Sequence, residues 1–166
     1  AAQPIVGMSY KDPLGTFTSN ALGTALLLEA LREADCAAAT VIVTSDNGCS
    51  PEADFPALAA HGHRPSHLYR GAKADLWEGG HRVPFIVRWP AKVKPAVSPQ
   101  LVCLTDIFAT CAEIVGARLP DNAGEDSFTF LGNLTGQGAS ARDAIVHHSI
   151  AGAFAIRQGV WKLALC

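Results

Sequence analysis

The stretch Thr40-Val41-Ile42-Val43-Thr44-Ser45-Asp46-Asn47-Gly48 decides the fold of this chain. Its β-branched apolar run ends in polar turn formers, a pattern that predicts a buried strand followed by a loop. Open α/β sheets bind their ligands at the carboxyl ends of the strands. We therefore expect the side-chain oxygens of Asp46 and Asn47 to hold a hard cation, because such cations take oxygen ligands. The alternative is a plain turn, since Asp, Asn and Gly tolerate left-handed backbone geometry.

A helix is expected directly before this strand. Ser19 or Asn20 can cap a helix whose leucines recur at helical spacing until about Ala34. The turn-rich residues 1–18 that precede it predict a surface loop. A helix that leads into a strand is one unit of an α/β fold.

The chain after Gly48 is rich in proline and histidine as far as Arg70. A loop of this length in a compact domain is usually functional or mobile, and within it only Phe55–Ala60 predicts a helical turn. His61 and His63 lie on this loop and could contact a substrate or a metal. The alternative is an exposed loop whose histidines have no such role.

A second α/β step follows. The pair Gly79-Gly80 permits the close approach of another backbone, and the apolar residues 85–89 after it predict a strand. Residues 104–115 carry apolar side chains at helical spacing and predict a helix. Residues 121–140 are polar and glycine-rich, which is typical of a linker.

Short strands are expected after the linker, at residues 145–148, 154–157 and 160–163, with Gln158-Gly159 as a hairpin turn. We therefore divide the chain into residues 1–140, part of an α/β domain, and residues 141–166, the start of a smaller antiparallel subdomain. We expect both ends to be cut, because no initiator Met opens the chain and Cys166 follows the last strand directly.

The composition is that of a globular chain. Its 166 residues are 49% hydrophobic and 17% charged, enough for one domain that buries about 70% of its unfolded surface. The net charge of -2 gives no basic field for nucleic acid and no polybasic membrane patch. No apolar run approaches the ~18 residues of a membrane span.

Five cysteines show no zinc-binding spacing, and an odd number cannot form a closed set of disulfides. They are Cys36, Cys49, Cys103, Cys111 and Cys166. Cys111 falls on the apolar face of the predicted helix, where we expect a small buried hydrophobic side chain.

Three motifs follow one another in a fixed order. They are Thr44-Ser45-Asp46-Asn47-Gly48, Arg70-Gly71-Ala72-Lys73 and Glu78-Gly79-Gly80-His81-Arg82-Val83-Pro84. In this order they resemble the C-terminal part of the catalytic domain of the arylsulfatase-like, formylglycine-dependent sulfatases. The resemblance extends through Leu104-Thr105-Asp106 to the predicted strands near the end, and so covers nearly the whole chain.

The resemblance implies an alkaline-phosphatase-like α/β fold, with a mixed sheet sandwiched by helices. It implies hydrolysis of aryl or carbohydrate sulfate esters by a formylglycine nucleophile beside a calcium ion. Carried over by position, Asp46 and Asn47 are calcium ligands and Lys73 contacts the sulfate. A cation and a lysine at those places can stabilise charge on the transferring group and its oxygens.

The family's nucleophile motif, Cys/Ser-x-Pro-x-Arg, is absent from this chain. Two further aspartate ligands and additional Lys and His residues of the family also lie upstream. Cys49-Ser50-Pro51-Glu52-Ala53 imitates the nucleophile motif, but Ala53 stands where arginine belongs and the segment follows the metal ligands. We therefore expect half a site and an inactive chain, with the missing N-terminal part of the same protein as its partner.

Two further histidines, His81 and His147, are candidates for substrate contacts, and the alternative is that each is buried with a hydrogen-bond partner. Glu78 and Arg82 predict a structural ion pair or a pair of side chains that bind the backbone. Two other functions stay open: a phosphate or phosphonate ester hydrolase of the same superfamily, and a folded remnant that binds anions without turnover. Since related sulfatases are often exported, we expect a periplasmic or secreted protein that acts on sulfated small molecules or glycans.

Overall fold

The computed structural model describes residues 11–165 of the chain and divides them between two compact units. The first comprises residues up to Thr40 together with Trp89–Ala91, and the second comprises Val41–Arg88 with the rest of the chain from Lys92. Among the described residues, no helix is long and apolar enough to cross a membrane.

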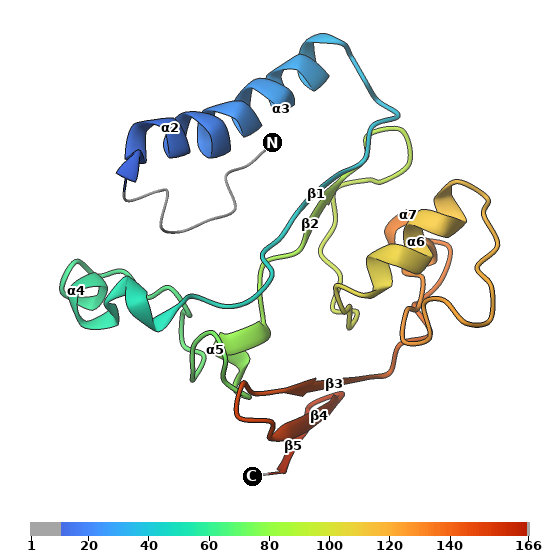
Figure 1. Cartoon of the computed structure of the whole chain (residues 1–166). Helices are drawn as coiled ribbons and strands as arrows, with labels where there is room; N and C mark the ends of the chain where they lie inside the picture. The colour runs from blue at the N-terminus through green and yellow to red at the C-terminus, as the bar shows by residue number, and fades with distance from the viewer. Residues whose placement is uncertain (1–10, 166) are drawn as a thin grey trace. The chain divides into compact units, whose positions relative to one another are not determined.

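The first unit contains one continuous helical run (Figure 1). It consists of α2 (Pro13–Phe17), the π-helical turn η1 (Thr18–Leu22) and α3 (Gly23–Glu33). The predicted start at Ser19 or Asn20 is wrong, because Asp12 accepts a hydrogen bond from the Gly15 amide at 2.9 Å and Pro13 occupies the first position. The loop expected over residues 1–18 is thus helical from Pro13, and its first ten residues lie outside the described part.

The predicted strand at Val41 is confirmed as β1 (Val41–Val43), and the second strand is β2 (Ile86–Arg88). The two pair antiparallel, with Ile42 opposite Val87. Contrary to the expectation of a fully buried strand, the last residue, Val43, is 51% exposed. The three-residue length explains this, since so short a pair cannot cover both of its faces.

Short helices occupy the long segment between these strands. They are the 3₁₀ turn η2 (Pro51–Ala53), α4 (Phe55–Ala60) and α5 (Glu78–His81). The predicted helical turn at Phe55–Ala60 is confirmed, and the Asp54 carboxylate caps it by accepting from the Ala57 amide at 3.2 Å. The Gly79-Gly80 pair lies inside α5, with both glycines buried.

A buried cluster forms around α6 (Asp106–Ile114) and α7 (Leu131–Thr135). Phe130 is 1% exposed, and the carboxylate of Asp106, which is fully buried, pairs with Arg142 at 2.8 Å. Residues 121–140 were expected to form a linker, but this prediction is wrong, because they contain α7 and pack Phe130 into the core. Cys111 is exposed rather than buried, since α6 turns its Asp106 and Thr110 side inward.

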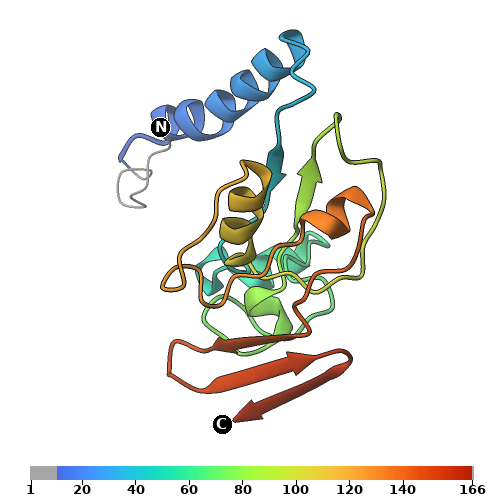
Figure 2. The same ribbon diagram turned by 90° about the vertical axis from the view of Figure 1, so that its right-hand side faces the viewer.

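The last three strands form an antiparallel sheet in the order β3-β4-β5, seen side by side in Figure 2. They are β3 (Ala144–His148), β4 (Phe154–Gln158) and β5 (Trp161–Leu165). The predicted strands and hairpin are confirmed, with the turn one residue later than expected because Gln158 pairs with Trp161. The division of the chain at residue 140 stays a prediction.

Candidate functional site

Two backbone hydrogen bonds join the three sequence motifs. The Gly48 amide donates to the Gly80 carbonyl at 2.8 Å, and the Lys73 amide donates to the Cys49 carbonyl at 2.9 Å. The loop after β1 therefore lies against both the Lys73 turn and α5. The structure thus brings the backbone of Lys73 against Cys49, which follows Asn47 by two residues and Asp46 by three.

Glycines make this close stacking possible. A Cβ atom on Gly48 would lie 1.8 Å from the Gly79 carbonyl oxygen, and one on Gly79 would lie 2.2 Å from the Gly71 oxygen. Both distances are far below van der Waals contact, so side chains at these positions would force the backbones apart. The Gly79 amide also donates to the Arg70 carbonyl at 2.8 Å, which holds α5 against the Arg70–Gly71 backbone.

The predicted cation ligands are available for binding. Asp46 is exposed and Asn47 is half-buried, and the Ser45 hydroxyl donates to the Asn47 carbonyl at 2.9 Å. Adjacent carboxylate and amide oxygens fit a hard cation, but they supply only two of its six to eight ligands. Within residues 11–165, no group of three or more His, Cys, Asp or Glu side chains could hold a metal.

Lys73 lies on an exposed turn that is conformationally unusual. Ala74, the next residue, has a φ of 78°, which a residue with a side chain adopts only at a cost. The Asp75 carboxylate accepts from the Ala72 amide at 2.8 Å, and the Asp75 amide donates to the Ala72 carbonyl at 3.0 Å. These two bonds close the turn that presents the Lys73 side chain.

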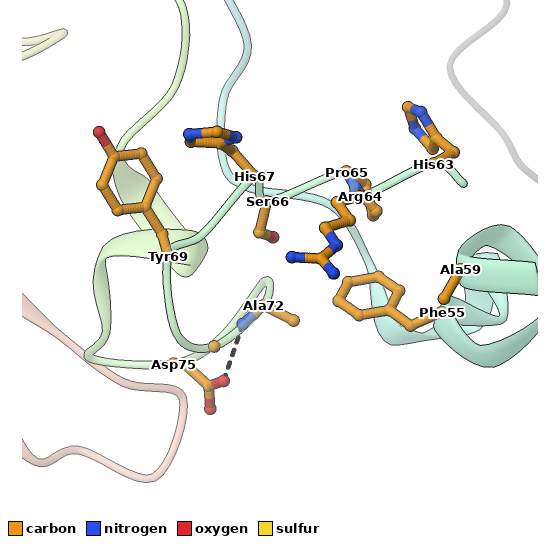
Figure 3. A pocket seen from close by; sticks show the side chains of 11 residues that line it. Phe55, Ala59, His63, Arg64, Pro65, Ser66, His67, Tyr69, Ala72 and Asp75 are labelled. Carbon is orange, nitrogen blue, oxygen red and sulfur yellow. Dashed lines mark hydrogen bonds between the residues drawn. The ribbon is translucent and has the colours of Figure 1, made fainter.

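A pocket of about 400 Å³ lies between the histidine-rich loop and this turn (Figure 3). His63, Arg64 and Tyr69 are among its lining residues, and the buried hydroxyl of Ser66, another, has no hydrogen-bond partner in the described structure. Figure 3 shows Arg64 directed toward the space between Ser66 and Phe55, whereas the ring of His63 points the other way. His61 is exposed at the end of α4 and does not line the pocket.

The other two candidate histidines meet in a different place. The rings of His81 and His147 lie 3.7 Å apart between centroids, beside the carboxylate of Glu78. Burial chiefly, followed by the nearby His147 and Lys162, lowers the pKa of His81 to about 4, and burial likewise lowers the pKa of His147. Their contact with a substrate stays a prediction, since both are engaged with neighbouring protein groups.

Glu78 is the centre of an ion-pair network that sequence reasoning found only in part. The predicted pair with Arg82 is present at 3.6 Å, but Lys162 is closer at 3.1 Å and Arg157 lies at 3.3 Å. Burial favours the neutral carboxyl, yet the hydrogen bond and charge of Lys162, together with Arg157, hold the pKa of Glu78 below its usual range. No local pattern could have revealed Lys162 as a partner of Glu78, because the two lie 84 residues apart in the sequence.

The chain is similar in sequence to known sulfatases. The family model described as Sulfatase matches residues 22–117. The chain is 41% identical to an N-acetylgalactosamine-6-O-sulfatase of Bacteroides thetaiotaomicron, over 74% of this chain and 24% of that protein. It is 34% identical to arylsulfatase A of Homo sapiens, again over 74% of this chain and 24% of the relative.

A solved structure gives the same result at the level of the fold. It is described under the metabolism of multiple glycosaminoglycans by Bacteroides thetaiotaomicron, and it matches with a TM-score of 0.75 and 37% sequence identity. The match covers 83% of this chain and 30% of that chain. The predicted mixed α/β class is therefore confirmed, and the chain spans about a quarter of the length of the curated relatives it matches.

Proposed function

Because this chain belongs to the sulfatase family and shares its alkaline-phosphatase-like fold, we propose that the whole protein hydrolyses sulfate esters. The observation that carries the proposal is the pair of backbone bonds from Gly48 to Gly80 and from Lys73 to Cys49. These bonds support the proposal because they hold residues 44–48, the proposed cation loop, against the lysine turn, and a cation and a lysine together can stabilise an oxyanion. In the whole protein, a part upstream of the present chain supplies the nucleophile.

Three residues of this chain have defined roles in the proposal. Asp46 and Asn47 are two of the calcium ligands, and the Lys73 ammonium contacts a sulfate oxygen. Calcium, when bound, withdraws charge from the sulfate oxygens, and formylglycine is the nucleophile expected from the upstream part. Lys73 stabilises the same negative charge from a fixed position, without the solvent reorganisation that water would require.

The relatives and the pocket support a proposal for the substrate class. One relative is named for a sulfated N-acetylgalactosamine, and we extend this to a sulfated carbohydrate or aryl group for the present protein. The pocket lined by His63 and Arg64 adjoins the Lys73 turn through Gly71 and Ala72, so it is suited to the organic part of such a substrate. His61, His81 and His147 stay candidates for further contacts, and export to the periplasm or beyond the cell is part of the same proposal.

The test is hydrolysis of 4-nitrophenyl sulfate by the full-length protein. We expect turnover that needs calcium and that falls at least about 10²-fold in Asp46→Ala, because a charged ligand is lost. Asp121→Ala is the matched control, since Asp121 is an exposed aspartate far along the chain, and it should retain wild-type rates.

Two results would contradict the proposal. If calcium affinity and rate are both unchanged in Asp46→Ala, Asp46 is only a turn residue. If the protein hydrolyses 4-nitrophenyl phosphate far faster than the sulfate, it is a phosphate ester hydrolase of the same superfamily.

A further inference from the structure

The segment from Arg70 to Arg82 has a second face, which the β3-β4-β5 sheet contacts. The Ile150 amide donates to the Ala74 carbonyl at 3.0 Å. The carbonyl of Leu76 lies 3.1 Å from His147 Nε2 and also accepts from the Lys162 ammonium. The segment that carries Lys73 is therefore held between the β1 loop on one side and the C-terminal sheet on the other.

Lys162 of β5 makes the densest set of these contacts. Its Nζ contacts the Leu76 carbonyl, Glu78 Oε1 at 3.1 Å and His81 Nε2 at 3.2 Å. An ammonium group has three donors and no acceptor, so each of its hydrogens has a partner. The side chain is only 15% exposed, which distinguishes Lys162 from an ordinary solvated lysine.

These contacts also fix the histidine tautomers. Because an ammonium only donates, His81 Nε2 must accept, which leaves its Nδ1 to donate to the Trp77 carbonyl at 3.3 Å. Because a carbonyl only accepts, His147 donates from Nε2 to Leu76. The ring of His81 is therefore neutral, and burial lowers the pKa of His147, so a positive charge on either ring beside Lys162 is disfavoured.

These contacts stabilise the turn that carries Lys73. Ala74 has a positive φ, and such conformations persist only where surrounding contacts fix them. Ile150 binds the Ala74 carbonyl directly, and Lys162 binds Leu76 and Glu78 just beyond. Glu78 is the first residue of α5, and the Gly80 carbonyl of the same helix accepts a hydrogen bond from the Gly48 amide of the cation loop.

We propose that Lys162 is a positioning residue, which holds Leu76 and Glu78 so that Lys73 and the cation loop keep their relative geometry. Its effect on turnover rests on the proposed sulfatase function. Lys162 itself does not touch the substrate, and it acts on the reaction only through the placement of Lys73.

A double-mutant cycle in the full-length protein tests this, with 4-nitrophenyl sulfate as substrate and all variants verified as folded by circular dichroism. Lys162→Met, which keeps the apolar stem, should lower kcat/KM about 10- to 100-fold, as expected for a displaced binding group. Adding Lys73→Ala should then cost far less than it costs the wild type, because both changes remove the same interaction. Lys162→Arg should recover part of the loss, and Lys94→Met, at an exposed lysine, should have no effect.

The positioning role is overturned if Lys162→Met leaves kcat/KM unchanged or if its effect multiplies fully with that of Lys73→Ala. If Lys162→Met does not fold, the same cycle is run with Lys162→Arg. Hydrogen exchange supplies a readout without turnover: amides of residues 70–82 should exchange at least about 10-fold faster in the variant, while those of α6 do not change. If the wild type hydrolyses no sulfate ester, the proposed function fails, and this exchange measurement alone decides the positioning role.

Discussion

Gly48 and Gly79 show why single residues without side chains matter in this site. A Cβ on either would collide with a neighbouring carbonyl oxygen, at 1.8 Å and 2.2 Å respectively. Neither has a positive φ, so the requirement is space and not backbone conformation. The Asp-Asn-Gly and Gly-Gly motifs are thus two halves of one close backbone contact.

We predict that Gly48→Ala destabilises the protein by about 1–3 kcal/mol or more, because the backbone of α5 must move away from the added methyl group. The same shift should weaken calcium binding, measured by isothermal titration alongside the urea unfolding midpoint. Gly132→Ala, in α7, is the control, since its Cβ would find only ordinary contacts with the Gly138 backbone, at 3.5 Å or more. A Gly48→Ala protein as stable as that control would contradict the stacking.

At the scale of elements, α5 is a helix that its own sequence could not sustain. It has four residues, two of them glycine, and helices so short are unstable alone. Its first residue, Glu78, is held by Arg157 from β4 and Lys162 from β5. The helix therefore exists because the C-terminal sheet supplies the opposite charges.

The histidine pair beside α5 predicts a loss of stability in acid. The folded-state pKa of His81 is about 4, below the ordinary value of about 6.5, so the unfolded state binds more protons between these values. The free energy of unfolding should therefore fall as the pH drops from about 6.5 to 4. His81→Asn should flatten this dependence in urea titrations across that range.

His61→Asn is the matched control for this measurement, because His61 is exposed. It should leave the pH dependence as in the wild type. An unchanged slope in His81→Asn would show that His81 is not held neutral in the folded protein.

A second element, α6, depends on a single buried carboxylate. Asp106 accepts from the Cys103 amide at 2.8 Å and the Phe128 amide at 2.9 Å, besides its pair with Arg142. It thereby connects the start of α6 to the segment that leads into α7. Arg142 also contacts Asp126, whose side chain is 70% exposed.

We predict that Asp106→Asn lowers the free energy of unfolding by about 3–5 kcal/mol, because it removes the buried counterion of Arg142 and leaves that charge only the exposed carboxylate of Asp126. Asp126→Asn should cost less than about 1 kcal/mol, since an exposed ion pair contributes little. Chemical denaturation of both variants provides the comparison. Equal losses in the free energy of unfolding would mean that the buried ion pair contributes no more to stability than the exposed one.

At the scale of the whole molecule, the chain spans about a quarter of the length of its curated relatives. In the proposed function it contributes two cation ligands and one lysine to a larger site. We predict that the isolated 166-residue chain does not hydrolyse 4-nitrophenyl sulfate, because its sequence lacks the family's nucleophile motif. Turnover above that of a Lys73→Ala chain would refute this prediction.

Sequence reasoning located β1, the α4 turn and the C-terminal strands, because hydrophobic pattern and turn residues act locally. The predicted start of the first helix is too late, because Asp12 caps the helix before Pro13, ahead of the leucines whose spacing indicates it. Sequence reasoning also mistook residues 121–140 for a linker. That error arose because Phe130 is buried among residues from other segments: its ring lies 5.5 Å from that of Phe85 between centroids, and its amide donates to the Thr110 hydroxyl at 3.1 Å.

The sequence by itself determined the family, the α/β class and the candidate residues Asp46, Asn47 and Lys73, because ordered motifs record these chemical requirements directly. The tertiary structure decided how those residues are held together. Only it shows that Gly48 stacks on Gly79 and that Lys162 directs its three hydrogens at Leu76, Glu78 and His81. The physical reason is that such contacts join segments far apart in the chain, and no local pattern encodes which distant partner a charge or a glycine will meet.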